Sequence, residues 1–227
     1  MAATTTGRNN KLWGDLLPIA HIMRTNPFSD VLDFLTEGEW TTYVFWLLIV
    51  ASIIIAAINL FRNSNQRSAV HLWNWTARFL IGAMWWQQSV WKAPPEFSGL
   101  HYWMEEMVKW ASTPLQQWFV KDVVLEHYHF FAPQVYGFEV LVALCLMIGL
   151  FTRLGALLGM AMAINLWLGL YRSPGEWPWA YFFLIILQIM FVIQRSGRSL
   201  GLDAILLRSQ KDSPDGSLWG RVFQFLS

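Results

Sequence analysis

The sequence has little charge and almost no cysteine, and both shortages exclude classes of protein. Charged residues make up 14% of the 227 residues, and 16 basic side chains nearly balance 15 acidic ones. Such a near-neutral chain offers no electrostatic basis for binding nucleic acid. Its one cysteine, Cys145, cannot form an intrachain disulfide, a CxxC pair, a haem attachment or an iron–sulfur site. Glycine-rich phosphate loops and the GxSxG motif are also missing.

Apolar and aromatic residues are present in excess instead. Hydrophobic residues make up 55% of the chain, and there are 15 tryptophans. Tryptophan favours the membrane–water interface, and helices satisfy their own backbone in lipid. The composition therefore predicts an all-α integral membrane protein. The first apolar stretch begins near residue 40, behind a polar leader, so we expect no cleavable signal peptide.

Five segments approach the ~20 apolar residues that cross a bilayer. They are Trp40–Phe61, His71–Trp91, Pro133–Phe151, Leu154–Tyr171 and Trp177–Gln194. Arginines gather after the first, third and fifth segments, whereas acidic residues outnumber lysines in the long connection between the second and third. The positive-inside rule then predicts a cytoplasmic C-terminus, an extracytoplasmic long connection and, with five spans, an N-terminus outside.

The long connection, residues 92–132, is predicted to be helical. Trp103, Met107 and Trp110 share one helical face, and Pro114 begins a second helical stretch. Two interpretations stay open: these helices lie flat at the membrane interface, or they pack on the bundle as a lid. The N-terminal tail, residues 1–39, could hold a further interfacial helix.

Three stretches resemble one known family. RFLIGAMWWQQSVWK resembles the start of the DoxX pattern, and LCLMIGLFTRLGALLG, which follows a glutamate early in its span, and GRSLGLD resemble its later parts in order and spacing. The stretch EWPWAY and the tryptophan-rich end of the second segment are more similar to the DoxD branch. That branch is the small membrane subunit of thiosulfate:quinone oxidoreductase. The resemblance covers residues 72–207, about 60% of the chain.

The resemblance implies a DoxX-like four-helix membrane bundle in residues 71–207. To it this chain adds an extra N-terminal transmembrane helix, residues 40–61, and a cytoplasmic tail, residues 208–227. It also implies the cytoplasmic (inner) membrane of a prokaryote and a second protein subunit. Quinone is the bound group that it implies, and neither a covalent cofactor nor a metal is expected.

Two functions stay open. The first is a membrane subunit that binds quinone and, with a partner, couples oxidation of thiosulfate or another sulfur compound to quinone reduction. The second is a non-catalytic accessory subunit of a larger respiratory or photosynthetic membrane complex. Likeness at the level of the fold cannot decide between them.

Polar side chains inside the apolar segments form the candidate ligand site, while no catalytic residue is predicted. Ionisable groups in a span cost roughly 2.5–3.5 kcal/mol, so they usually face the interior and have a partner. The predicted ligand site comprises Arg78, Gln87, Gln88, Glu139, Asn165, Gln188, Trp85 and Trp86. In it Arg, Gln and Asn would supply donors to a quinone carbonyl, and the tryptophans could stack on the ring. The alternative is structural: Arg78 pairs with Glu139 or with backbone carbonyls to fix the helix register.

Other polar residues favour structural roles. Lys92 is expected to snorkel to the outer membrane surface, and Thr152 to cap the fourth segment. Asp203 is expected to cap a helix or anchor the tail. His127 and His129 could bind a metal with Glu126 only in an extended segment.

Small residues recur every four positions at Gly155, Gly159 and Ala163. This spacing lets two helices approach closely. It favours packing inside the chain, with a dimer interface as the alternative.

Overall fold

The computed structural model describes residues 26–97, 99–211 and 218–227, and these contain helices but no strand. The chain divides into two compact units, residues 1–44 and 45–227, with the boundary inside one continuous helix. The first unit contains α2, Pro27–Thr36, which begins where the Asn26 side chain accepts from the Phe28 N–H at 2.8 Å. Most of the predicted N-terminal tail, residues 1–25, lies outside the described residues.

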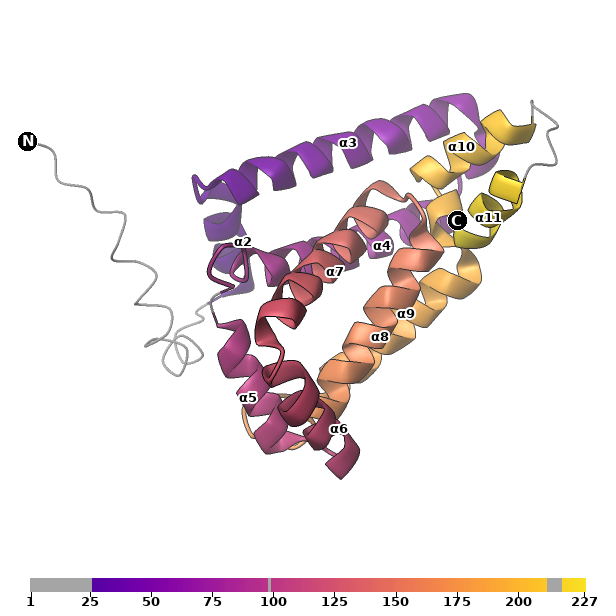
Figure 1. Cartoon of the computed structure of the whole chain (residues 1–227). Coiled ribbons are helices and arrows are strands. Elements are labelled where there is room, and N and C mark those ends of the chain that lie inside the picture. The colour runs from indigo at the N-terminus through magenta and orange to yellow at the C-terminus, as the bar shows by residue number, and fades with distance from the viewer. Residues whose placement is uncertain (1–25, 98, 212–217) are drawn as a thin grey trace, which may run out of the picture. The chain divides into compact units, whose positions relative to one another are not determined.

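Five helices coincide with the five predicted segments (Figure 1): α3 (Trp40–Arg62), α4 (Ala69–Val90), α7 (Tyr128–Ile148), α8 (Thr152–Leu170) and α9 (Pro178–Gln194). Of these, α3, α7 and α8 are long and apolar enough to cross a membrane. Helix α9 is apolar but has only 17 residues. Helix α4 has 22 residues, but polar side chains lower its hydropathy. That α4 and α9 also cross stays a prediction.

The bundle is built from two main helix pairs, α4 with α7 and α8 with α9, which are joined by packing of α7 on α8. The turn between α7 and α8 is tight because Gly149 adopts a positive φ of 72°, which a side chain disfavours. Helix α7 begins at Tyr128, five residues before the predicted start. The prediction placed Pro133 at the helix start, but it is the sixth residue of α7 and lies inside the helix, where it cannot donate to the His129 carbonyl.

The small-residue stripe of α8 packs inside the chain. A Cβ added at Gly155 would lie 2.4 Å from Cys145 Cβ, and one at Gly159 would lie 2.6 Å from Gln188 Nε2. Ala163 is fully buried. The small residues therefore allow α8 to approach α7 and α9, as the intrachain interpretation predicted.

Residues 100–125 of the long connection are helical. They form α5 (Leu100–Trp110), α6 (Pro114–Trp118) and a π-helix (Phe119–Leu125). An apolar cluster around Leu100, Met104 and Met107 packs with Leu170 at the end of α8. The methionines of α5, rather than its tryptophans, thus form its buried face. The side of the membrane on which these helices lie stays a prediction.

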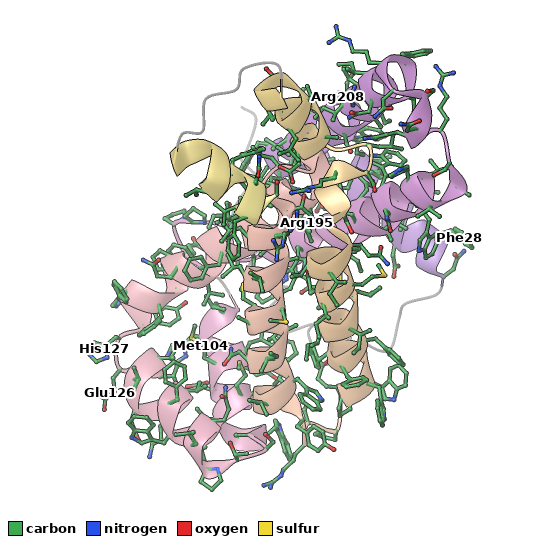
Figure 2. The ribbon with its side chains drawn as sticks, turned by 90° about the vertical axis from the view of Figure 1, so that its right-hand side faces the viewer. Phe28, Met104, Glu126, His127, Arg195 and Arg208 are labelled. Carbon is green, nitrogen blue, oxygen red and sulfur yellow. The ribbon has the colours of Figure 1, made fainter. Side chains whose placement is uncertain are left out.

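The opposite end of the 45–227 unit holds the helix ends Arg62, Ile148 and Gln194 together with α10 (Leu202–Lys211) and α11 (Leu218–Leu226). Figure 2 shows Arg195 and Arg208 at this end, with Glu126 and His127 at the other. Helix α3 forms few contacts with the other helices of the 45–227 unit, and hydrogen bonds are among these contacts. Ser52 donates to the Met147 carbonyl at 2.7 Å, and Asn59 donates to the Gly201 carbonyl at 3.0 Å.

Candidate functional site

Five polar side chains from α4, α7 and α9 are buried within the bundle. Each has a hydrogen-bonding atom that finds no partner within residues 26–97, 99–211 and 218–227. We call them the buried polar set: Arg78, Trp85, Trp86, Glu139 and Gln188. A buried donor or acceptor without a partner costs about 1–3 kcal/mol, so such groups are rare and require a reason.

Helix α4 carries three members of this set, and two of them, Arg78 and Trp85, lie on one face. Arg78, Gly82, Trp85, Ser89 and Lys92 follow at intervals of three and four residues, and all are buried. That interval keeps residues on one side of a helix. The face turns towards α7, because a Cβ on Gly82 would lie 2.8 Å from Met147 Cγ.

Three successive turns of α7 contact the polar groups. Glu139 meets Lys92, Val142 lies beside the Gln188 amide, and the Leu146 carbonyl accepts from Arg78 Nη1. Seven residues separate Glu139 from Leu146, which corresponds to about 10 Å along a helix. The polar groups therefore follow α7 through the apolar part of the bundle.

Gln188 is the most isolated member of the set. It has no exposed surface, and neither its Nε2 nor its Oε1 finds a partner among the described residues. Gly159 leaves the space for its amide, since a Cβ there would lie 2.6 Å from Nε2. Trp85 and Trp86 add two buried indole N–H groups that are also unpartnered.

The predicted pairing of Arg78 with Glu139 is wrong, and the alternative partner, a backbone carbonyl, is the one found. Arg78 donates to the Leu146 carbonyl, whereas Glu139 forms an ion pair with Lys92. Arg78, on α4, therefore bonds to α7 at Leu146, about two turns along that helix from Glu139. The prediction that Lys92 snorkels outward is also wrong, because its ammonium turns inward to Glu139 and the residue is only 7% exposed.

Three predicted site residues lie away from the buried polar set. Gln87 and Gln88 are exposed, because they do not lie on the face of α4 that packs on α7. Asn165 is half-buried and accepts from Gln116 Nε2 on α6 at 2.8 Å. Asn165 thus joins α8 to the long connection. The 3–4 spacing from Arg78 could have identified Lys92 from sequence, but no local signal pointed to Gln116.

A second polar region closes the end of the bundle near α10. We call it the glycine-rich end, and it comprises Gly149, Thr152, Gly197, Gly201 and Asp203. A Cβ on Gly197 would lie 2.1 Å from Asp203 Oδ2, and one on Gly201 would lie 2.3 Å from the Gly197 carbonyl oxygen. Only glycine fits at either position without a shift of the backbone or of Asp203.

Asp203 caps α8, as its sequence context predicted. Its carboxylate accepts from the N–H groups of Phe151 at 2.9 Å and Thr152 at 3.2 Å, which begin that helix. The prediction that the Thr152 side chain caps α8 is wrong. Thr152 is the first residue inside the helix, and Phe151 occupies the cap position before it. Burial raises the pKa of the Asp203 carboxyl, while the two N–H groups and, more weakly, the charge of Arg78 oppose that shift.

Chemically, the buried polar set offers donors among buried apolar side chains. Indole, amide and guanidinium N–H groups suit a ligand with carbonyl acceptors, and two aromatic rings lie among them. The Oε2 atom of Glu139 can hold a proton. Within the described part of the chain, no three His, Cys, Asp or Glu side chains converge as metal ligands.

These features define the class first: an α-helical membrane protein with several apolar helices and a polar interior. Residues 102–220, just over half of the 227, match the family described as TQO small subunit DoxD. The chain belongs to the DoxD family. No curated protein and no solved structure matches it. The matched range includes Glu139 and Gln188 but begins after α4, which carries the rest of the buried polar set.

Proposed function

We propose that this chain is a membrane subunit of a thiosulfate:quinone oxidoreductase-type enzyme, and that the buried polar set binds the quinone head group. The observation that supports this is the group of unpartnered buried donors on Trp85, Trp86 and Gln188. Since each unpaired group costs free energy, a ligand that accepts their hydrogen bonds would recover it. The family description supports the reaction and the existence of a partner.

A quinone head fits these donors chemically. It carries two carbonyl acceptors on a flat ring, which match N–H donors and neighbouring aromatic faces. Quinone accepts electrons and protons when it is reduced. In this proposal Arg78 and Gln188 orient the carbonyls, Glu139 holds a proton at Oε2, and the apolar bundle excludes water.

The proposed subunit crosses the cytoplasmic membrane of a prokaryote five times, through α3, α4, α7, α8 and α9. Its C-terminus lies in the cytoplasm, its N-terminus and the α5–α6 connection outside. Single cysteines at Ser64 and Glu105, both exposed, test this in a Cys145→Ala background. We expect Glu105→Cys to react with an impermeant thiol reagent in intact cells, and Ser64→Cys to react only after lysis. The reverse pattern would refute the orientation.

Quinone content tests the ligand. Gln188→Leu removes a donor and an acceptor at nearly constant volume, and Trp85→Phe removes one donor. Loss of one hydrogen bond is worth about 1 kcal/mol, so we expect Gln188→Leu to lower quinone affinity roughly fivefold. The measurement is the quinone retained per mole of gently purified protein, determined by extraction and chromatography.

Trp110→Phe is the matched control, because Trp110 lies in the long connection and already donates to Glu106 at 2.7 Å. We expect that variant to retain quinone at the wild-type level. Equal quinone content in wild type, Gln188→Leu and Trp85→Phe would refute the proposed site. A protein that purifies within a larger complex and contains no quinone would support the accessory-subunit function instead.

A further inference from the structure

A basic pocket lies at the glycine-rich end, outside the buried polar set. Its volume is about 390 Å³, within the range of ligand pockets. Three arginines line it, Arg195, Arg198 and Arg208, together with Gln66, Gln224 and the apolar side chain of Leu207. Among its lining residues there is no carboxylate. Three guanidinium groups around one cavity favour an anion.

The arginines keep donors available for a ligand. The exposed Arg195 uses its backbone to bond to Phe191 and Arg198, which leaves its guanidinium turned to the pocket, and Arg198 Nε is buried without a partner among the described residues. Arg198 Nη2 donates to the Gln224 carbonyl at 3.0 Å and approaches Ser227 Oγ at 3.4 Å. Arg208 Nη2 donates to Asn59 Oδ1, which positions it at the pocket wall.

The local charge is incompletely balanced. Burial, followed by the positive charge of Arg195, lowers the pKa of the Arg198 guanidinium, and Arg153 adds to this effect. Asp203 is the carboxylate that opposes the shift, but its oxygens already accept from Phe151 and Thr152. A bound anion would reduce the repulsion among the arginines.

The position of the pocket indicates the source of the anion. Arg195 directly follows α9, and Asn63, which also lines the pocket, directly follows α3. The ends of two apolar helices therefore meet where lipid headgroups lie. Figure 2 shows Arg195 and Arg208 at this one end of the bundle. Basic pockets between membrane helices suit anionic phospholipid headgroups, and Leu207 provides an apolar contact that a free ion would not use.

We propose that this pocket binds the phosphate group of an anionic phospholipid, which connects α3, α9 and α10 at the membrane surface. The site is independent of quinone binding and does not rest on the proposed enzymatic function.

Lipid-dependent thermal stability tests the proposal. The full-length protein in neutral detergent is titrated with phosphatidylglycerol, with phosphatidylcholine or with inorganic phosphate, and unfolding is followed by intrinsic fluorescence. At a hundredfold excess over the dissociation constant, we expect phosphatidylglycerol to raise the midpoint by about 5 °C. The other two additives should leave it unchanged.

Variants test whether the shift in unfolding midpoint arises from lipid binding at this pocket. In Arg195→Gln/Arg208→Gln we expect the phosphatidylglycerol shift to fall to less than half, while Arg62→Gln keeps it. Arg62 is an exposed arginine at the same end that does not line the pocket. If the double variant does not fold, Arg195→Gln alone serves, because the Arg195 side chain is exposed and the backbone bonds of this residue do not depend on the side chain.

Three outcomes would overturn the proposal. A full shift in the variants that fold would place lipid binding elsewhere. An equal shift with inorganic phosphate would identify a free anion as the ligand. An equal shift with phosphatidylcholine would show that the anionic charge is irrelevant.

Discussion

The glycine-rich end and the buried polar set are both buried, but they differ in how far their polar atoms have partners. Asp203, Gln66 and Asn59 at or beside the glycine-rich end each bond to neighbouring backbone. In the buried polar set, Gln188 and both tryptophans have polar atoms that nothing in the described part of the chain satisfies. At the glycine-rich end Thr152 Oγ1 and, in the adjoining pocket, Arg198 Nε also lack a partner among the described residues, so the difference between the two regions is one of degree.

This difference distinguishes a stretch that carries the family resemblance from the residues proposed to bind a ligand. The stretch GRSLGLD, which carries the family resemblance, forms the glycine-rich end and holds the helix ends together. Its glycines and aspartate are explained by close packing and capping, without any ligand. Of the unpartnered donors, those of Arg78, Trp85 and Trp86 lie in the stretch RFLIGAMWWQQSVWK, which also carries the resemblance, whereas Gln188 lies outside the resembling stretches.

The largest expected effect comes from breaking the ion pair between Lys92 and Glu139. Lys92→Met leaves the Glu139 carboxylate buried without its counter-charge. Loss of one partner of a buried pair costs about 3–5 kcal/mol. We expect the free energy of unfolding, measured by denaturation in mixed micelles, to fall by that amount.

The double variant Lys92→Met/Glu139→Gln sharpens this prediction. Neutralising both groups removes the uncompensated charge, so much of the lost stability should return. A double variant as unstable as the single one would mean that the pair is held for a reason other than charge compensation.

Gly197→Ala tests the packing of the glycine-rich end. The new Cβ would lie 2.1 Å from Asp203 Oδ2 and 2.2 Å from Thr152 Oγ1. Overpacking of this kind costs about 1–3 kcal/mol or more, and here it would also displace the cap of α8. We expect a lower unfolding midpoint and poorer expression.

The control is Gly137→Ala in α7, where a Cβ would meet nothing within 4 Å. Alanine in an open helical position stabilises by roughly 0.5–1 kcal/mol. Equal loss of stability in both alanine variants would contradict the packing explanation.

The same substitution, glutamine to leucine, can be made in both regions, at Gln66 and at Gln188. Gln66 Nε2 donates to the Arg198 carbonyl at 2.9 Å, and its Oε1 accepts from the Leu200 N–H at 2.8 Å. Gln66→Leu breaks both bonds and should cost about 2 kcal/mol. The free energy of unfolding is again the measured quantity.

In Gln188→Leu no hydrogen bond within the described residues is lost, so the ligand-free protein should be as stable as wild type or more stable by about 1 kcal/mol. This is the smallest change in the free energy of unfolding that we predict, and the informative result is whether stability rises or falls. A loss equal to that of Gln66→Leu would show that Gln188 has a structural partner.

Much of the fold could be predicted from the sequence. The apolar runs located α3, α4, α7, α8 and α9, because long apolar helices leave a strong compositional signal. The small-residue spacing in α8 predicted close packing within the chain. Helix boundaries were less accurate, as at α7, where the helix starts before Pro133.

The candidate site could be predicted only in part. Polar residues in apolar runs identified Arg78, Glu139 and Gln188 as buried, since an exposed charge in lipid is costly. The same rule was wrong for Gln87 and Gln88, which are exposed. That rule depends on residue type alone and does not include the face of the helix on which a side chain lies.

By itself, the sequence determined the helical membrane class, the family resemblance and which polar side chains require an explanation. Only the tertiary structure decided their partners: Lys92 rather than Arg78 for Glu139, and Asp203 rather than Thr152 as the cap of α8. The physical reason is that composition and helical periodicity act over neighbouring residues along the chain. A buried charge or hydrogen-bonding group is satisfied across helices, at distances that depend on how 45–227 packs as a whole.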